Sequence, residues 1–134
     1  MADKTKSPVE AVPPGYHAIT PYLAVQGVPA VMDFLARAFG AKEVFRHAGP
    51  DGAVANAEME IDGSKVMLGE LPKDRKAMTA MLNLYVSDAD AVYARAVAAG
   101  GASIMEPNDR SYGDRVGAVA DPAGTQWWIA TRKR

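Results

Sequence analysis

Two stretches of the chain repeat apolar side chains every three or four residues, which predicts helices. The first lies within residues 28–40, where the spacing is carried by Val31, Phe34, Leu35 and Phe39. The second lies within residues 89–100, where Asp88 or Asp90 can cap the first turn. Gly40 and the pair Gly100-Gly101 are expected to end the two helices, because glycine is typical of helix ends.

Short apolar or alternating segments surround each helix and predict strands. One segment precedes each helix, at residues 18–25 and 81–86. Three follow the first helix, at about 42–47, 53–61 and 64–70, and three follow the second, at about 102–106, 115–120 and 125–131. The order is therefore βαβββ twice, which indicates an α+β domain.

The sequences of the two halves align without a gap at a constant offset of 61 residues. Leu23 then falls on Leu84, and Gly40 falls on Gly101. We interpret residues 18–70 and 79–131 as two copies of one unit within a single domain, residues 18–134. Residues 1–17, rich in proline and charge, are expected to form a mobile lead-in.

Composition narrows the classes of function. The chain has 134 residues and a formal net charge of -1, which argues against a nucleic-acid partner because such surfaces are basic. It has no cysteine, so disulfides and cysteine-ligated zinc are excluded. No apolar run reaches the length of a membrane span or a signal peptide. We expect a cytoplasmic protein with no membrane partner.

The two repeats contain several recognisable motifs: GYHAITPYLAV (15–25), AFGAKEVFR (38–46), YVSDAD (85–90), YGDR (112–115) and DPAGTQWWIAT (121–131). With them the chain resembles the vicinal oxygen chelate superfamily, in its PhnB-like glyoxalase/bleomycin-resistance branch. The resemblance implies a curved eight-stranded half-barrel with the helices on its outer face and a ligand site in its hollow. It also implies a homodimer. It does not specify a reaction, because one fold hosts many functions.

Alternation along the strands predicts which side chains face the hollow. Trp127 falls on the helix side and Trp128 in the hollow. The expected ligand-binding residues are Tyr22, Asn56, Met67, Met81, Asn83, Tyr85, Arg115 and Trp128. The aromatic rings among them suit a flat or apolar ligand, although they could instead fill a closed core or a dimer contact. Arg115 could bind a ligand anion or form a salt bridge with Glu58 or Asp114.

The metal enzymes of the superfamily bind their ion with His and Glu side chains on the first and fourth strands of each unit. The resemblance carries these positions over to Thr20, Met67, Met81 and Trp128. None suits a hard or borderline cation, so we expect no metal and no cofactor. His17 would need a three-residue change of register to reach the first position, and His47 is expected at the surface.

Glu58 is the one candidate for a catalytic role, as a general base. It lies in the middle of the 53–61 strand and is expected to face the hollow, whereas Glu60 is expected to be solvated at the strand end. No serine has a histidine partner in a recognisable arrangement.

These observations predict a small-molecule-binding protein of the glyoxalase/bleomycin-resistance type. It would lack the usual metal site and hold an aromatic or amphipathic ligand in the hollow. One alternative is a lyase or isomerase, or a metal-dependent glyoxalase-like enzyme, that uses non-standard residues such as Glu58, Glu70 or His47. The other is an interaction protein with a filled hollow.

Overall fold

The computed structural model describes residues 11–133, which form two βαβββ modules. The first module contains β1 (Tyr22–Val25), α1 (Val28–Phe39), β2 (Lys42–Ala48), β3 (Val54–Ile61) and β4 (Ser64–Glu70). The second contains β5 (Met81–Tyr85), α2 (Ala89–Ala98), β6 (Ala102–Asp109), β7 (Asp114–Ala120) and β8 (Gln126–Arg132). The predicted α+β plan of two repeats is confirmed.

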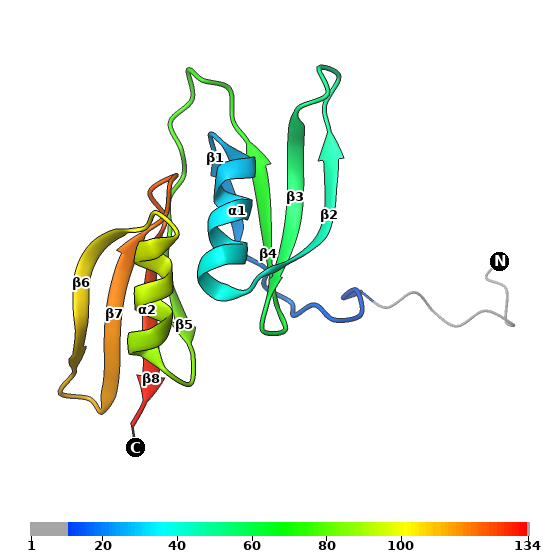
Figure 1. Cartoon of the computed structure of the whole chain (residues 1–134). Helices are drawn as coiled ribbons and strands as arrows, with labels where there is room; N and C mark the ends of the chain where they lie inside the picture. The colour runs from blue at the N-terminus through cyan, green and yellow to red at the C-terminus, as the bar shows by residue number, and fades with distance from the viewer. Residues whose placement is uncertain (1–10, 134) are drawn as a thin grey trace, which may run out of the picture.

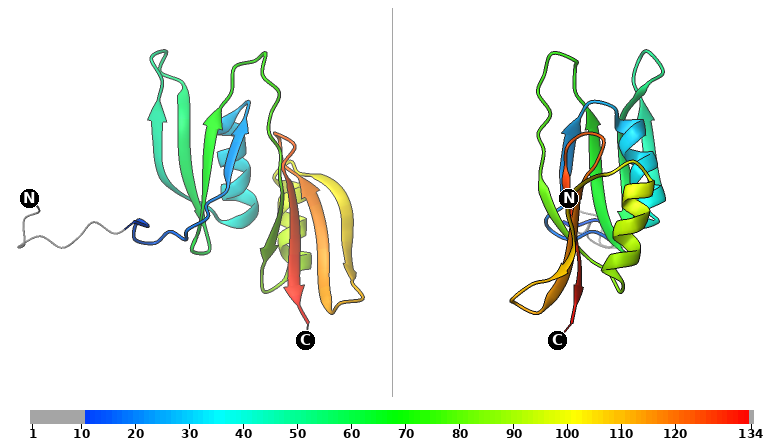
Figure 2. Two further views of the ribbon diagram at one scale, coloured as in Figure 1. Left: turned by 180° about the vertical axis from the view of Figure 1, so that it is seen from behind. Right: turned by 60° about the vertical axis from the view of Figure 1, so that its left-hand side comes forward.

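Each module is a four-stranded sheet, in the orders β1-β4-β3-β2 and β5-β8-β7-β6. The β1/β4 and β5/β8 pairs are parallel, and the remaining pairs are antiparallel. The sheets lie side by side with β1 and β5 inside, and both helices cover one face (Figure 1). Views from behind and from the side show the other face of the strands free of helices, and the barrel is not closed (Figure 2). We call this free surface the open face.

The helices begin at contacts supplied by the last strand of each module. The Glu70 carboxylate accepts hydrogen bonds from the backbone N–H groups of Gly27 and Val28, at 2.8 and 2.9 Å. In the second module Thr131 Oγ1 accepts from the Ala89 N–H at 2.8 Å. A carboxylate at a helix N-terminus satisfies unpaired N–H groups and complements the helix dipole. Glu70 therefore caps α1, which removes it from the candidate catalytic groups.

The core lies between the helices and the sheets. In α1 the buried apolar stripe includes Val31, Phe34 and Leu35, as its periodicity predicts. The two modules share this layer, since the Phe39 ring at the end of α1 lies 5.1 Å from the Trp127 ring of β8. Trp127 is only 2% exposed, so its predicted burial on the helix side is confirmed.

The strand register confirms the duplication but corrects its alignment. Tyr22 lies opposite Met67, and the ungapped alignment places this pair correctly on Asn83 and Trp128, which also lie opposite each other. On the other neighbour of β4, strand β3, Glu58 lies opposite Met67. The ungapped alignment places Glu58 on Val119 and Met67 on Trp128, so it predicts that Val119 lies opposite Trp128.

The residue opposite Trp128 is instead Ala118, so the ungapped alignment is wrong for β7. It fails because the turns before the last strand of each module differ in length. Two residues separate Ile61 from Ser64, the last pair of β3 and β4, whereas three separate Asp121 from Thr125.

Candidate functional site

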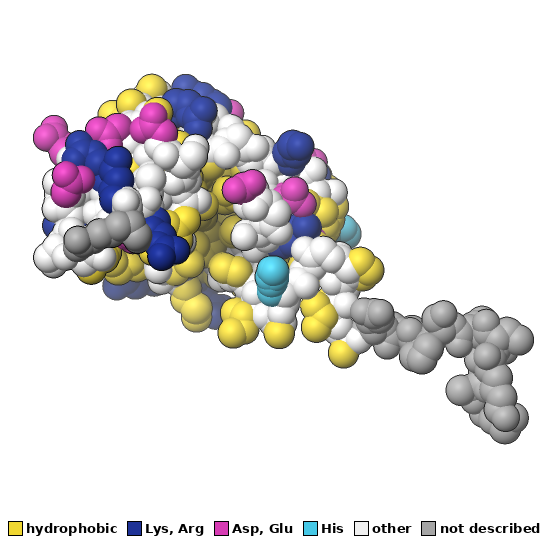
Figure 3. All heavy atoms as spheres, turned by 90° about the horizontal axis from the view of Figure 1, so that it is seen from below, with side chains coloured by type: hydrophobic (Ala, Val, Ile, Leu, Met, Phe, Trp, Pro, Cys, Tyr) yellow, Lys and Arg dark blue, Asp and Glu magenta, His cyan; other side chains and the backbone are white. Residues whose placement is uncertain are grey.

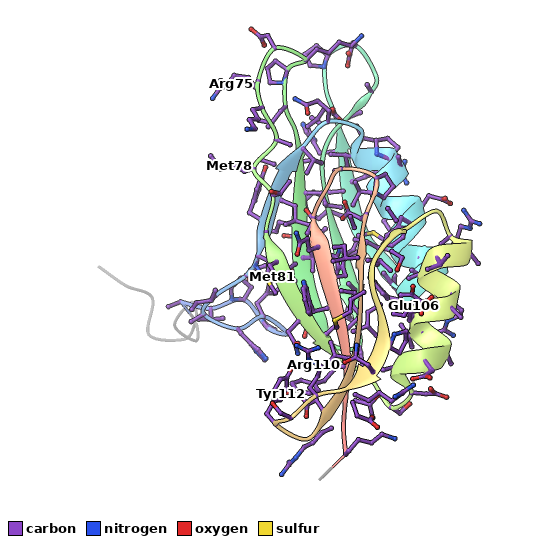
Figure 4. The ribbon with its side chains drawn as sticks, turned by 90° about the vertical axis from the view of Figure 1, so that its left-hand side faces the viewer. Arg75, Met78, Met81, Glu106, Arg110 and Tyr112 are labelled. Carbon is purple, nitrogen blue, oxygen red and sulfur yellow. The ribbon has the colours of Figure 1, made fainter. Side chains whose placement is uncertain are left out.

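The open face brings together most of the predicted ligand-binding residues. Directly opposed residues on paired strands share a face. Tyr22, Met67 and Glu58 therefore form one row across the first sheet, with Asn56 further along β3. Met81, Asn83, Tyr85 and Trp128 occupy the same face of the second sheet. Met81 lies on the side of the molecule away from both helices (Figure 4).

Several large apolar side chains on this face are solvated rather than packed. Tyr22 is 56% exposed, Met81 63% and Tyr85 58%, while Trp128 and Met67 are half-buried. Met78, on the segment that links the modules, is also exposed and lies on the same side of the molecule as Met81 (Figure 4). Its N–H donates to the Ala24 carbonyl of β1 at 2.9 Å, which ties this segment to the first sheet. The open face is thus not a closed core within this chain, and exposed apolar clusters of this kind mark binding surfaces.

Tyr22 owes its position to a glycine on the neighbouring strand. Its ring atoms Cε1 and Cζ lie 2.8 Å from the point that a Cβ of Gly69 would occupy. A side chain on Gly69 would therefore displace the ring. The buried Gly69 gives Tyr22 the space to lie flat over β4.

The carboxylate of Glu58 accepts a hydrogen bond from the Tyr16 hydroxyl, which raises the pKa of Tyr16 above its ordinary value. The Lys65 ammonium lies 5.1 Å from the centre of the Tyr16 ring and donates to the Gly15 carbonyl at 3.2 Å. A cavity of about 300 Å³ lies beside this contact, and Tyr16, Thr20, Glu58 and Met67 are among its lining residues. The residues before β1 thus build part of the site.

This contact changes the picture of the predicted mobile lead-in. Residues 1–10 lie outside the described part of the chain. Residues 15 and 16 are tied to the first sheet. Sequence reasoning missed Tyr16, because a polar, proline-rich start carries no periodicity that would place it. Glu60, expected to be solvated, pairs with Lys65 at 2.8 Å, and this hydrogen bond lowers the pKa of Glu60.

In the second sheet, polar partners fix two of the open-face rings. The Tyr85 hydroxyl donates to Oδ2 of the buried Asp114 at 2.8 Å, and this bond raises the pKa of Tyr85. The Trp128 indole N–H donates to Gln126 Oε1 at 3.1 Å. Hydrogen bonds within the chain therefore orient both rings. Asp114 was not predicted as part of this face because the ungapped alignment assigned β7 the wrong parity.

Arg115 does not lie on the open face, so its predicted place in the hollow is wrong. Its guanidinium binds Asp90 of α2, with the closest contact at 2.6 Å, and Asp109 at 3.2 Å. These bonds raise the pKa of Arg115 and lower that of Asp90. The one-residue change of register in β7 explains the error, since such a slip moves each side chain to the other face.

The positions carried over from the metal enzymes do not fit a metal ion. Thr20 precedes β1, and Met67, Met81 and Trp128 offer two thioethers and an indole N–H donor. Within residues 11–133, no group of three His, Asp or Glu side chains is placed to hold a cation. His47 is exposed on the outer strand β2, opposite Asn56. His17 lines both the cavity beside Glu58 and a second cavity, described below.

The described residues contain no helix that is long and apolar enough to cross a membrane.

A family model of the Glyoxalase/Bleomycin resistance protein/Dioxygenase superfamily matches residues 15–129, and the chain belongs to this superfamily. Among its relatives is an uncharacterized protein of Mycobacterium tuberculosis H37Rv, 37% identical, for which the match covers 82% of this chain and 71% of that protein. An uncharacterized protein of Mycobacterium bovis is also 37% identical over 82% of this chain and 80% of its own length.

Solved structures share the fold. TioX from Micromonospora sp. ML1 superimposes with a TM-score of 0.70 at 23% identity, over 86% of this chain and 95% of that one. The PhnB protein from Bacillus cereus does so with a TM-score of 0.65 at 19% identity, over 86% and 99%. At these identities the similarities show that the fold is shared.

Proposed function

We propose that this protein binds a small aromatic or amphipathic molecule on its open face and that it does so without a metal ion. The observation that carries the proposal is the set of solvated, oriented rings and thioethers at Tyr22, Tyr85 and Met81. Flat apolar ligands gain affinity from aromatic walls, and a few polar groups fix their orientation. Glu58, Asn56 and Asn83 supply such groups on the same face.

A titration with 8-anilinonaphthalene-1-sulfonate, an amphipathic aromatic probe, tests this proposal. The dye should bind saturably to the folded protein, and Tyr22→Ala or Tyr85→Ala should weaken binding by about tenfold each, the equivalent of about 1.4 kcal/mol. Val97→Ala, which shortens an exposed side chain on α2, is the matched control and should change nothing. Binding that is insensitive to both tyrosines would reject the open face as the site.

A second function, proton transfer in a lyase or isomerase, is favoured by the contact between Tyr16 and Glu58. A carboxylate beside a hydroxyl at the wall of a 300 Å³ cavity can act as a general base toward a carbon acid bound there. The test is deuterium exchange at the carbon next to the carbonyl of dihydroxyacetone. Exchange that is catalysed by the wild type and lost in Glu58→Gln would support catalysis. Equal exchange in both proteins would reject it.

We also propose that the protein forms a homodimer and acts in the cytoplasm. The exposed apolar side chains of the open face support association, because a second subunit could cover those that a ligand leaves exposed. Sedimentation of the full chain at micromolar concentration tests the dimer, and a monomer would contradict it. Fractionation of cells that express the full chain tests the location.

A further inference from the structure

A second cavity, of about 220 Å³, lies at the seam between the two modules. Its walls are apolar side chains from both modules: Ile61 and Val66 from the first, and Leu82, Leu84 and Trp127 from the second. Seen from below, hydrophobic side chains line the recess between the two halves of the molecule (Figure 3). Residues of the segment before β1, including His17 and Thr20, complete the lining.

The cavity exists because β1 starts late. In the second module, β5 pairs with β8 from the first residue of β8, Gln126 opposite Met81. In the first module, pairing begins only at Tyr22 opposite Met67, so residues 64–66 of β4 extend beyond β1. Pro21 has no N–H group and cannot donate to a sheet ladder, which accounts for the short strand. The space left beside β4 is the seam cavity.

The seam cavity combines apolar walls with a few polar groups at its edge. Lys65 is one of these, and its side chain is only 12% exposed. Among the described residues, its ammonium donates to Glu60 and to the Gly15 carbonyl, which uses two of its three N–H donors. Because Glu60 balances the charge of Lys65, the site favours a neutral oxygen acceptor over a full anion. Asn83 adds an amide to the lining.

We propose that the seam cavity is a ligand site for a single-ring aromatic molecule that carries a hydroxyl or carbonyl oxygen. An apolar cavity of roughly 150 Å³ is known to accept benzene, so the seam cavity has room for one ring and a small polar substituent. The ring would lie against Leu82, Leu84 and Trp127, with its oxygen toward Lys65. This site adjoins the open face, with which it shares Asn83, but each has its own tryptophan, Trp127 here and Trp128 there.

Because each site has its own tryptophan, binding at each can be measured separately by the quenching of tryptophan fluorescence. The probe is 4-bromophenol, which has the proposed size and oxygen and whose heavy atom quenches indole fluorescence on contact. In Trp128→Phe only Trp127 emits, so this variant reports the seam cavity. In Trp127→Phe only Trp128 emits, and this variant reports the open face. We expect saturable quenching in Trp128→Phe, whether or not the open face also binds the probe.

A filling variant tests whether the quenching arises in the cavity. Ser64 is an exposed residue at the start of β4 that lines the cavity, so Ser64→Phe should occupy part of the volume. Ala102→Phe, at the exposed start of β6, is the matched control. In the Trp128→Phe background, Ser64→Phe should weaken 4-bromophenol binding by at least about tenfold, while Ala102→Phe should leave it unchanged.

Three results would overturn the proposal. The first is quenching of Trp127 that rises linearly without saturation, which indicates collision only. The second is equal affinity in Ser64→Phe and Ala102→Phe. The third is a structure of the full chain with a residue of a second copy in the cavity. If Ser64→Phe and Ala102→Phe both keep the native circular dichroism spectrum, unfolding is excluded as the cause of any loss of 4-bromophenol binding.

Discussion

The indole Nε1 of Trp127 donates a hydrogen bond to Oδ2 of Asp121, 3.0 Å away, inside the core. The other carboxylate oxygen of Asp121 accepts from the backbone N–H groups of Ala123 and Thr125, at 2.9 and 3.1 Å. One acidic residue therefore closes the turn before β8 and satisfies the only polar atom of a buried tryptophan ring. Burial nevertheless raises the pKa of Asp121 above its ordinary value of 3.8, although these hydrogen bonds oppose the shift.

Replacing Asp121 with Asn should destabilise the fold by about 1–3 kcal/mol at neutral pH. The amide has one acceptor oxygen in place of two, so either the indole N–H or the two backbone N–H groups lose their acceptor. Urea unfolding of both proteins measures this difference. The gap should widen as the pH falls through the folded pKa of Asp121. The folded wild type then binds a proton before the unfolded chain does, which stabilises it, and the Asn variant has no such group. The widening should stop below about pH 3.8. A gap that narrows on acidification would mean that the folded pKa is lowered.

Arg115→Gln should leave the binding of 8-anilinonaphthalene-1-sulfonate unchanged, because the guanidinium lies on the helix side with Asp90 and Asp109. It should lower the thermal midpoint, since it leaves both carboxylates without their cation. Asp90 has a lowered pKa in the folded state, so this loss should be present at neutral pH and fade as the pH falls below about 4. A dye affinity that drops in this variant would return Arg115 to the ligand site.

The wrong prediction for Arg115 shows which side-chain orientations can be predicted from the sequence and which cannot. Alternation placed Tyr22, Met67, Asn83 and Trp128 correctly, because β1, β4, β5 and β8 keep the offset of the ungapped alignment. It failed in β7, where a turn of different length shifts the parity by one and no apolar pattern marks the change. The glycine matches that suggested an ungapped alignment do not report register.

The contacts that complete the site could not be predicted from the sequence either. The hydrogen bond between Tyr16 and Glu58 joins two segments far apart in the chain, and the seam cavity depends on how two modules pack. Both are set by tertiary geometry rather than by local propensity.

Gly69→Ala should alter the open face without breaking the fold. Its new methyl group would meet the Tyr22 ring, whose flexible side chain can move away. We expect dye binding to weaken, with little change in the urea midpoint. In a Tyr22→Ala background the same substitution should have no further effect on binding, so a double-mutant cycle isolates the coupling. Additive losses would mean that Gly69 acts by another route.

Metal ions should not stabilise this protein. After treatment with EDTA, addition of Ni²⁺, Zn²⁺, Mn²⁺ or Fe²⁺ should leave the thermal midpoint unchanged. A specific site would stabilise the fold by roughly 2.7 kcal/mol at a hundredfold excess over its dissociation constant. A saturable rise that disappears in Glu58→Gln would show instead that Glu58 is a metal ligand.

Truncation of the two adjacent tryptophans should have different effects on stability and on binding. Trp127→Ala removes a ring that is 2% exposed, contacts Phe39 and satisfies Asp121, so it should cost about 3–5 kcal/mol of stability. Trp128→Ala removes a half-buried ring from the open face and should cost less, on the order of 1–2 kcal/mol. It should, however, weaken dye binding more than Val97→Ala does. Urea unfolding and dye titration of both variants measure the two effects. Equal destabilisation by both, with no loss of dye binding in Trp128→Ala, would mean that the open face is covered core in solution, and the ligand proposal would fail with it.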